Sequence, residues 1–551
     1  MNTIFHNARI YVDKGRFAEA LLINGGIISA VGSSDEILAM SEPDDIIYDC
    51  CGRTMIPGLN DSHLHFMQYG ETLNQVNLED VTSIDEIIGR CRRFISEHPD
   101  KAARGIHAIG WNQDFFEDEK RIPDRHDLDK ISTDIPVVLE RVCGHIASTN
   151  TKLIENLGLN ENSPQYPSGE FIRENSGYPA GIFRGGACIY AKEAVPDFTI
   201  EEKRQIIIDT MKSAAAFGLT SIQSNDIGAD FSDSSEAFAM MRDIYDKGEA
   251  SVRYHYQMCF ETPEKFSEFL SSEEFTGNLY PEDSWLTMGS LKLFKDGSLG
   301  ARTAYMKDGY AADRSNKGLQ WLSCEEMDRF CAIARDAGVQ VVTHAIGSQA
   351  IAETIESYEK AFVDGSNKLR HGIIHCQITD KELVQQITDD DILVMAQPVF
   401  IDFDMNIAEE LCGSQLTSTS YAFGTMLRNG VHLSYGTDCP VETCNPFLNI
   451  YEAVTRKDRN GRPENGFYPA EAVDVETAID AYTMESAYAQ FAENRKGRLK
   501  PGFYADLVIL DRDIFTVDPM EIKDIHPVLT MTGGKIVYIS DDAPAAGHSR
   551  R

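Results

Sequence analysis

NDSHLHF, residues 60–66, sets two histidines one residue apart. In an extended chain successive side chains point to opposite faces, so His63 and His65 share one face while Leu64 takes the other. Two imidazoles on one side of a strand can bind one metal ion. An isolated HxH pair is more often just two polar residues, so this interpretation depends on what the rest of the chain supplies.

The chain around this stretch alternates strand-like and helical runs. After TMIPGLNDSHLH at 54–65, seven further strand-like runs begin at residues 219 (LTSIQSND), 251 (SVRYHYQM), 289 (GSLKLFKDG), 339 (VQVVTHAIG), 370 (RHGIIHC), 392 (ILVMAQPV) and 431 (VHLSYGTD). Such alternation is typical of parallel βα units. Eight strands predict an α/β fold with a (β/α)₈ TIM-type barrel, in which active sites lie at the carboxyl ends of the strands.

Short β-like runs lie at both ends of the chain, too few at either end to form a core alone. We therefore predict one small β-sandwich from residues 1–55 and 497–540, with the barrel at 56–496. Residues 72–200 then form a large insertion after the first barrel strand, and we interpret it as a lid or substrate lobe. Residues 541–551, DDAPAAGHSRR, are predicted to be a disordered tail.

Composition limits the partners. The 551 residues carry a formal net charge of -36, which repels nucleic acid and anionic membranes, so a small-molecule substrate is favoured. The sequence shows no targeting segment and no apolar run of about 20 residues, and we predict a cytoplasmic protein with no membrane partner. The 12 cysteines form no CxxC pair, which argues against zinc-finger spacing. A homodimer is left open.

Six candidate metal ligands fall where predicted barrel strands end. They are His63, His65, Lys292, His344, His375 and Asp438. Imidazole and carboxylate ligands suit zinc, with iron and manganese left open. Taken singly, each has an ordinary explanation, since a lysine is usually a solvated charge and an aspartate after a strand is usually a turn or cap residue. The hypothesis depends on all six falling at strand ends of one barrel.

Two ambiguities accompany this set. His371 is four residues before His375 and on the same face of the strand, so it is the alternative ligand. We prefer His375 because it is nearer the carboxyl end. Lys292 as an ammonium would repel a metal, whereas a lysine carbamate would be an anionic ligand. Lys295, three residues on, faces the opposite side and is expected to tolerate alanine.

Several motifs resemble the amidohydrolase superfamily, especially its family 3 branch, which includes N-substituted formamide deformylase. They are IPGLNDSHLHF (56–66), SLKLFKDGSLGARTA (290–304), THAIGSQA (343–350), RHGIIHCQ (370–377), SYGTDCPV (434–441) and GRLKPGFYADLVILD (497–511). The resemblance covers nearly the whole chain. The sequence departs from it at Ile374, where relatives usually carry glutamate.

The resemblance implies one or two divalent ions, with zinc favoured, and a role for each ligand. His63 and His65 would bind the more buried ion, and His344 and His375 the second. Lys292, carboxylated, would bridge them or bind alone. Asp438 would contact metal, take a proton from water as general base and deliver it to the leaving nitrogen as general acid. Whether the site holds one metal or two is left open.

The implied reaction is metal-dependent hydrolysis of an amide-like C–N bond, N-formyl or N-acyl, in a small molecule. A deaminase of the same superfamily is the first alternative, and a non-catalytic barrel scaffold is the second. Four residues are substrate-binding candidates: His145, Asp296, Arg302 and Trp111. Each has a structural alternative, namely a turn histidine, an Asp296–Arg302 pair, or a tryptophan in a core.

Overall fold

The computed structural model describes residues 1–548 except 118, 143, 167–168, 229–234, 273–274 and 276–283. The chain divides into two compact units. The first consists of Met1–Phe66 and Ile208–Arg551, and the second of Met67–Ile207. The long insertion predicted from the sequence falls within the second unit.

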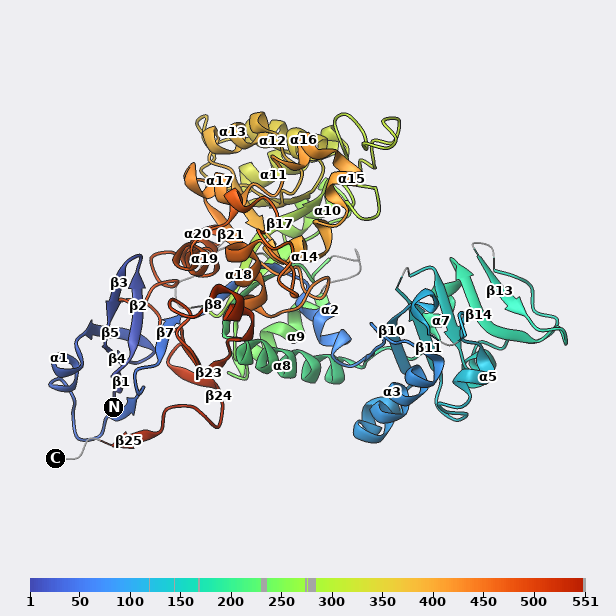
Figure 1. The fold of residues 1–551 in the computed structure, drawn as a ribbon, viewed down its shortest axis with the longest axis horizontal. Helices are drawn as coiled ribbons and strands as arrows, with labels where there is room; N and C mark the ends of the chain where they lie inside the picture. The colour runs from blue at the N-terminus through green and yellow to red at the C-terminus, as the bar shows by residue number, and fades with distance from the viewer. Residues whose placement is uncertain are drawn as a thin grey trace. The chain divides into compact units, whose positions relative to one another are not determined.

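A sheet of eight parallel strands forms the centre of the first unit (Figure 1). In spatial order it runs through β21 (Leu433–Tyr435), β20 (Leu393–Ala396), β19 (Gly372–His375), β18 (Val341–Ala345), β17 (Leu286–Phe294), β16 (Arg253–Met258), β15 (Leu219–Ser224) and β8 (Leu59–Leu64). The loop after β21 meets β8, where Asp438 N donates to His63 O at 2.9 Å and His65 N donates to Cys439 O at 2.7 Å. The predicted barrel and its eight strands are confirmed.

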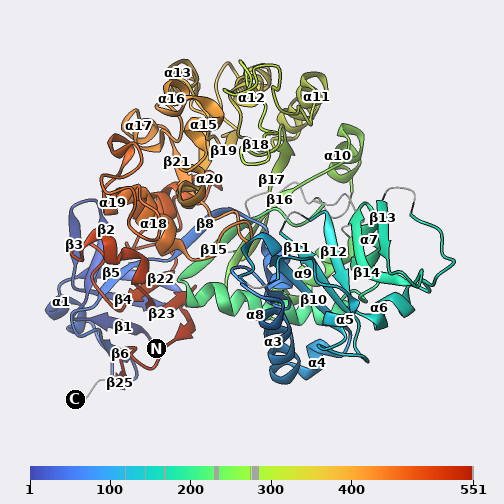
Figure 2. The same ribbon diagram turned by 45° about the vertical axis from the view of Figure 1, so that its right-hand side comes forward.

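Helices lie between the strands and cover the outside of the barrel. Their bounds are α8 (Ile200–Ala216), α9 (Ser235–Asp246), α10 (Pro263–Leu270), α11 (Cys324–Ala337), α12 (Ser348–Ala361), α13 (Lys381–Asp389), α17 (Phe423–Arg428), α18 (Pro446–Thr455) and α19 (Val475–Tyr482). Figure 2 shows α11, α12 and α13 on the outer side of β17, β18 and β19. Local sequence sets their ends: in α11 the Ser323 hydroxyl caps the first turn, and Gly338 ends the helix at φ 71°.

The two chain ends build a small β-sandwich beside the barrel (Figure 1). One sheet contains β25 (Ala546–His548), β6 (Ile46–Asp49), β1 (Thr3–His6), β4 (Ala20–Asn24) and β5 (Ile27–Gly32). The other contains β24 (Lys535–Ile539), β23 (Pro527–Thr532), β22 (Leu507–Leu510), β7 (Thr54–Pro57), β2 (Arg9–Asp13) and β3 (Arg16–Ala18). Buried Leu21 and Ile23 of the first sheet share a core with Leu507 and Leu529 of the second.

The end of the chain differs from the sequence prediction. Residues 541–551 were expected to be a disordered tail, but Ala546–His548 form β25 and pair antiparallel with β6. An edge strand is held by main-chain hydrogen bonds, so small and polar side chains do not prevent it from forming. Residues 549–551 lie outside the described part of the chain.

The second unit has its own mixed sheet and two apolar cores. In spatial order its strands are β13 (Gly169–Arg173), β14 (Pro179–Gly185), β12 (Ile146–Thr149), β11 (Val137–Arg141), β10 (Ile106–Trp111) and β9 (Val76–Asn77). The helices α3 (Ile84–Glu97), α6 (Thr151–Asn156) and α7 (Ala187–Glu193) supply apolar faces to these cores. The predicted role of this insertion as a lid stays a prediction.

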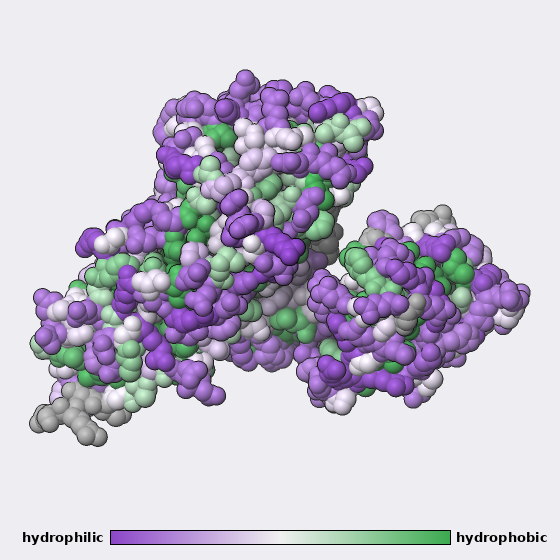
Figure 3. All heavy atoms as spheres, viewed as in Figure 1, coloured by the Kyte–Doolittle hydropathy of each residue, from purple (hydrophilic) through white to green (hydrophobic). Residues whose placement is uncertain are grey.

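Hydrophilic residues cover most of the face drawn in Figure 3, in keeping with the net charge of -36. A search of the described residues for a helix with the length and apolar character needed to span a bilayer finds none.

Candidate metal centre

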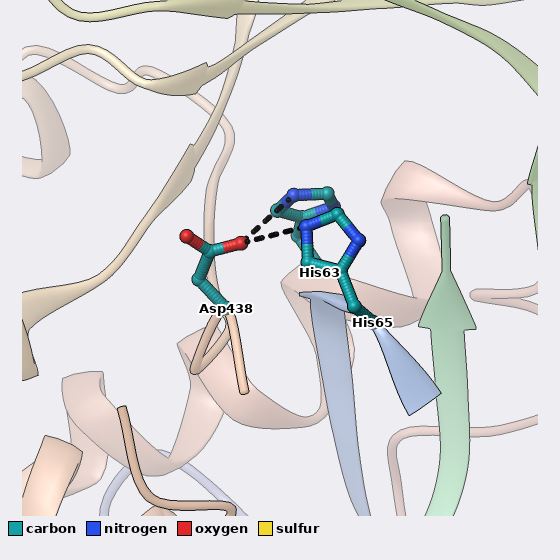
Figure 4. A group of neighbouring side chains, drawn as sticks. All are labelled: His63, His65 and Asp438. Carbon is teal, nitrogen blue, oxygen red and sulfur yellow. Dashed lines mark ion pairs between the residues drawn. The ribbon is translucent and has the colours of Figure 1, made fainter. Parts of the chain in front are cut away.

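The carboxyl ends of β8 and β21, the two outermost strands of the barrel sheet, bring two histidines and an aspartate together (Figure 4). His63 lies in β8, His65 follows it, and Asp438 lies on the loop after β21. The Oδ1 atom of Asp438 is 3.2 Å from His63 Nε2 and 3.3 Å from His65 Nε2. The potential ligand atoms of the three residues all lie within 4.8 Å of one another. The carboxyl ends of neighbouring barrel strands therefore bring potential metal-ligand atoms close together.

The other three predicted ligands lie in the same place. Lys292 Nζ is 3.3 Å from His63 Nε2. The ring centroid of His375 is 5.9 Å from that of His63, and the ring centroid of His344 is 4.5 Å from that of His375. The structure thus brings all six candidates to the carboxyl ends of the barrel strands.

His371 lies away from this group. Its Nδ1 accepts a hydrogen bond at 2.9 Å from the main-chain N of Val341, the first residue of β18. His371 directly precedes β19, whereas His375 is its last residue, and four residues of extended chain span about 13 Å. The geometry therefore favours His375 as the ligand.

Hydrogen-bond partners fix the proton positions on the first two imidazoles. His63 Nδ1 lies 2.6 Å from Gln257 Oε1, and His65 Nδ1 lies 2.8 Å from the carbonyl oxygen of Asn225. The Gln257 amide is oriented because its Nε2 donates to Ser62 O at 2.9 Å. Both acceptors lack a proton, so in the neutral imidazole Nδ1 carries the proton and Nε2 faces Asp438 with a lone pair. Burial alone would lower the pKa of His65, but the adjacent Asp438 raises it, which favours a second proton on His65 Nε2 when no cation is bound.

Hydrogen-bond partners also orient the other two imidazoles. His375 Nδ1 lies 2.8 Å from Gln397 Oε1, while Gln397 Nε2 donates to Met395 O at 3.0 Å. His375 therefore also keeps its lone pair on Nε2. His344 Nε2 donates to Gly297 O at 3.1 Å, so it is Nδ1 of His344 that keeps a lone pair. Partners of this type commonly orient metal-bound imidazoles.

Sequence reasoning missed these partners. Gln257 lies on β16 and Gln397 directly follows β20. Glutamine is common in many contexts, and the only available signal was its position near the carboxyl end of a predicted barrel strand. That signal is weak, because it does not say which imidazole a given glutamine will meet.

The cluster fits a divalent cation. Asp438 Oδ1 is buried and has no hydrogen-bond partner among the described residues, although the Nε2 atoms of His63 and His65 lie 3.2 and 3.3 Å from it. Atoms that all carry lone pairs repel one another at this distance unless a cation or a proton lies between them. Imidazole nitrogen and carboxylate oxygen are also zinc ligands. The residues present therefore suit a metal of that class.

Burial sets the protonation states that ligands need. It lowers the pKa of His63 to about 3, with a further contribution from Lys292. Burial alone would raise the pKa of Asp438, but the adjacent imidazoles of His63 and His65 hold it well below its ordinary value. Burial also lowers the pKa of Lys292 to about 8. At neutral pH the cluster thus contains a neutral His63 and an ionised Asp438, the forms that bind metals.

Two ligand positions adopt left-handed backbone geometry. His375 has φ 73° and Asp438 has φ 57°. This region is uncommon for residues other than glycine, though Asp and His are enriched there, and it is often found at functional sites. At His375 it coincides with the last residue of β19, whereas Asp438 lies on the loop three residues after the end of β21.

Asp296 and Arg302 were predicted to contact substrate or to pair with each other. In the structure each of them interacts with different partners. Asp296 is buried and accepts hydrogen bonds from the main-chain N of Ile346, Gly347 and Tyr305 at 2.8–3.0 Å. Its Oδ1 is also 3.4 Å from His344 Nε2. Arg302 is more than half exposed and lies 3.6 Å from Glu410. Asp296 therefore positions the loop around His344.

The two candidates in the insertion occupy different environments. Trp111 is fully buried and belongs to a core of the second unit that includes Ile106 and Phe116. This burial agrees with the core role that was its alternative, because a large apolar ring gains most by complete burial, and a substrate contact of Trp111 stays a prediction. His145 is exposed in this unit, and its predicted substrate contact stays a prediction.

Replacing Gln397 tests the orientation of the imidazoles. In Gln397→Leu the acceptor for His375 Nδ1 is lost, so the ring can rotate or change tautomer, and the affinity for zinc should fall about 10- to 100-fold. Competition with a chromogenic chelator measures this. Gln385→Leu, in which an exposed glutamine that contacts Asp389 is replaced, is the matched control. Equal zinc affinity in the two variants would contradict the assignment.

A parallel barrel that gathers imidazole and carboxylate ligands at the carboxyl ends of its strands defines the class of barrel metallohydrolases. A profile described as the Amidohydrolase family matches residues 47–538. The chain belongs to the amidohydrolase family, and it is a hydrolase of the corresponding superfamily.

Three proteins illustrate the similarity. YtcJ of Bacillus subtilis is 28% identical over 541 residues, covering 98% of this chain and 99% of its own. N-substituted formamide deformylase of Arthrobacter pascens is 22% identical and covers 97% of each chain. The crystal structure of an uncharacterized metal-dependent hydrolase of Pyrococcus horikoshii superimposes with a TM-score of 0.75 at 27% identity, covering 94% of this chain and 99% of that one.

Proposed function

We propose that this protein is a metal-dependent amidohydrolase that cleaves the C–N bond of an N-formyl or N-acyl amide in a small molecule. The observation that carries the proposal is the convergence of four imidazoles, Asp438 and Lys292 on one group at the barrel mouth. The similarity to N-substituted formamide deformylase supports the choice of an amide-like bond.

The ligand set favours zinc, held by His63, His65 and Asp438, with His344 and His375 available for a second ion. A divalent metal bound here supplies a water of lowered pKa and polarises the carbonyl group under attack. Asp438 accepts the proton of the attacking water, because its buried carboxylate is ionised and its Oδ1 faces the cluster. It then delivers that proton to the leaving nitrogen.

Lys292 is proposed to act as a carbamate. Its Nζ is buried 3.3 Å from His63 Nε2, a position in which an ammonium would repel a bound cation. Addition of carbon dioxide to the neutral amine, with loss of one proton, gives a carbamate whose two oxygens carry one negative charge. This group can bind one metal or bridge two. The presence of Lys292 among the candidate ligands favours amide hydrolysis over hydrolytic deamination.

Aromatic side chains beside the histidines indicate an apolar group on the substrate. The ring centroid of Phe294 lies 5.7 Å from that of His344, and Phe400 lies 5.7 Å from His375. Trp321 stacks on His344 with centroids 6.3 Å apart and remains 57% exposed. An exposed tryptophan at this position can cover an apolar substituent. N-formyl and N-acyl amides with such substituents are therefore the first compounds to assay.

A substrate panel with metal removal tests the proposal. The purified protein is assayed on N-formyl amides, N-acyl amides, cyclic imides and nucleobases, before and after chelation, with metal content measured by elemental analysis. We expect one or two metal ions per chain, hydrolysis of an N-formyl or N-acyl amide, loss of activity on chelation, and recovery with zinc or manganese. Ammonia release from a nucleobase would support the deaminase, and only trace metal with no activation would support the scaffold.

A further inference from the structure

A lysine lies buried at the amino-terminal end of the barrel, the opposite end from the metal cluster. Lys496 is 6% exposed, and its Nζ donates a hydrogen bond to Ser221 Oγ in β15 at 2.7 Å. An ammonium group offers three donors. Buried ammonium groups carry a large desolvation penalty unless a negative charge lies close to them.

The nearest ion pair at this end is already complete. Arg253, the first residue of β16, donates from Nε and Nη2 to Asp506 at 2.9 and 3.2 Å. Asp506 also accepts a hydrogen bond from Gly533 N at 2.6 Å. The Asp506 carboxylate is thus committed to Arg253 and Gly533. One donor of Arg253, Nη1, is buried and has no hydrogen-bond acceptor in the described part of the chain.

Arg253 and Lys496 line the same small cavity. Its volume is about 30 Å³, enough for about two water molecules. Its walls include Arg253, Trp285, Thr287, Gln490, Arg495 and Lys496. Among the described residues that line it, none is acidic. The guanidinium of Arg253 is held against the rings of Trp285 and Tyr504, with its Cζ 4.8 and 4.2 Å from their centroids.

We propose that this cavity binds one small inorganic anion, with the charge and size of chloride, between Arg253 Nη1 and Lys496 Nζ. Such an anion accepts from the buried Nη1 donor and adds negative charge beside the Lys496 ammonium, because the neighbouring Asp506 carboxylate is already paired with Arg253. The cavity is too small for a nucleotide or a sugar phosphate.

The competing explanation is a neutral lysine. Burial and the nearby Arg253 lower the pKa of Lys496 well below its ordinary value, against the opposing effect of Asp506, and this favours an uncharged amine when no anion is bound. In that case the cavity would hold only water, and the stability of the protein would not depend on which anion the salt supplies. The two explanations therefore differ in a measurable way.

Anomalous diffraction from crystals soaked in sodium bromide locates the anion directly. We expect one bromide peak between Arg253 Nη1 and Lys496 Nζ in the wild-type protein and no peak there in Lys496→Met. Water at this position in the wild type, with no anomalous peak at saturating bromide, would overturn the proposal. Since this measurement uses the wild-type chain, it stands even if the variant folds poorly.

Thermal unfolding in two salts gives an independent measurement. Sodium chloride is compared with sodium gluconate at equal ionic strength, because gluconate is too large for the cavity. Tm should rise with chloride and level off, as expected for a ligand that binds only the folded state. Lys496→Met should lose this dependence, whereas Lys360→Met, at an exposed lysine that pairs with Asp328, should keep it. Equal Tm values for the wild type in both salts would count against an anion site.

Discussion

Asp438→Asn is expected to lower kcat by about 10²- to 10⁴-fold while most of the bound metal remains. The asparagine Oδ1 can still occupy the position between His63 and His65, so one ligand oxygen is kept. An amide cannot accept the proton of the attacking water, and the general base is lost. Turnover of the substrate found in the panel and elemental analysis of the same preparation measure both effects.

Two control variants distinguish the loss of the general base at Asp438 from the loss of a carboxylate elsewhere on the loop and from the loss of a metal ligand. Glu442→Gln changes a carboxylate to an amide on the same loop, at a side chain that pairs with Arg459, and should leave kcat near the wild-type value. His63→Ala should lose metal and rate together, because it removes a ligand. An Asp438→Asn enzyme that works at the wild-type rate would remove this residue from the mechanism.

Lys292→Ala is expected to empty the more weakly held metal position and to lower activity at least about 100-fold. The alanine removes the proposed carbamate, so two cations close together would lose the anion that offsets their repulsion. Acetate or propionate should restore part of the metal and the rate, because the space left by the buried side chain can admit a small carboxylate. Titration of activity and metal content against acetate measures this rescue.

Two further variants test whether Lys292 matters as a carbamate or as a positive charge. Lys292→Arg keeps the positive charge but cannot form the lysine carbamate, so it should be as defective as alanine and should not respond to acetate. Activity of Lys292→Arg near the wild-type level would contradict the carbamate. In the wild type, activity should increase with bicarbonate when carbon dioxide has first been removed.

Lys295 cannot serve as a control for Lys292, although its position in the sequence suggested that it would tolerate alanine. It does face away from Lys292, but it is fully buried, and its Nζ lies 2.8 Å from Glu353. Alanine at this position would leave the Glu353 carboxylate without its cationic partner and would cost about 3 kcal/mol of stability. The expectation that Lys295 tolerates alanine is therefore wrong, and the reason is a partner 58 residues further along the chain.

The sequence by itself determined the barrel and the positions of its candidate ligands. Strand and helix periodicity is a local property, and parallel strands joined by helices can close in few ways, so eight strands were enough to predict the fold. The carboxyl ends of the strands then placed residues such as His63, Lys292 and Asp438 at one mouth. The same locality explains why His375 could be preferred over His371.

Tertiary structure alone decided which atoms meet. The tautomer of His63 depends on Gln257, 194 residues away, and the burial of Trp111 depends on a core formed by the insertion. Lys496 and Arg253 line one cavity although 243 positions separate them. Contacts of this kind arise from packing between distant segments, and no local pattern of residue types records which side chain will be the neighbour.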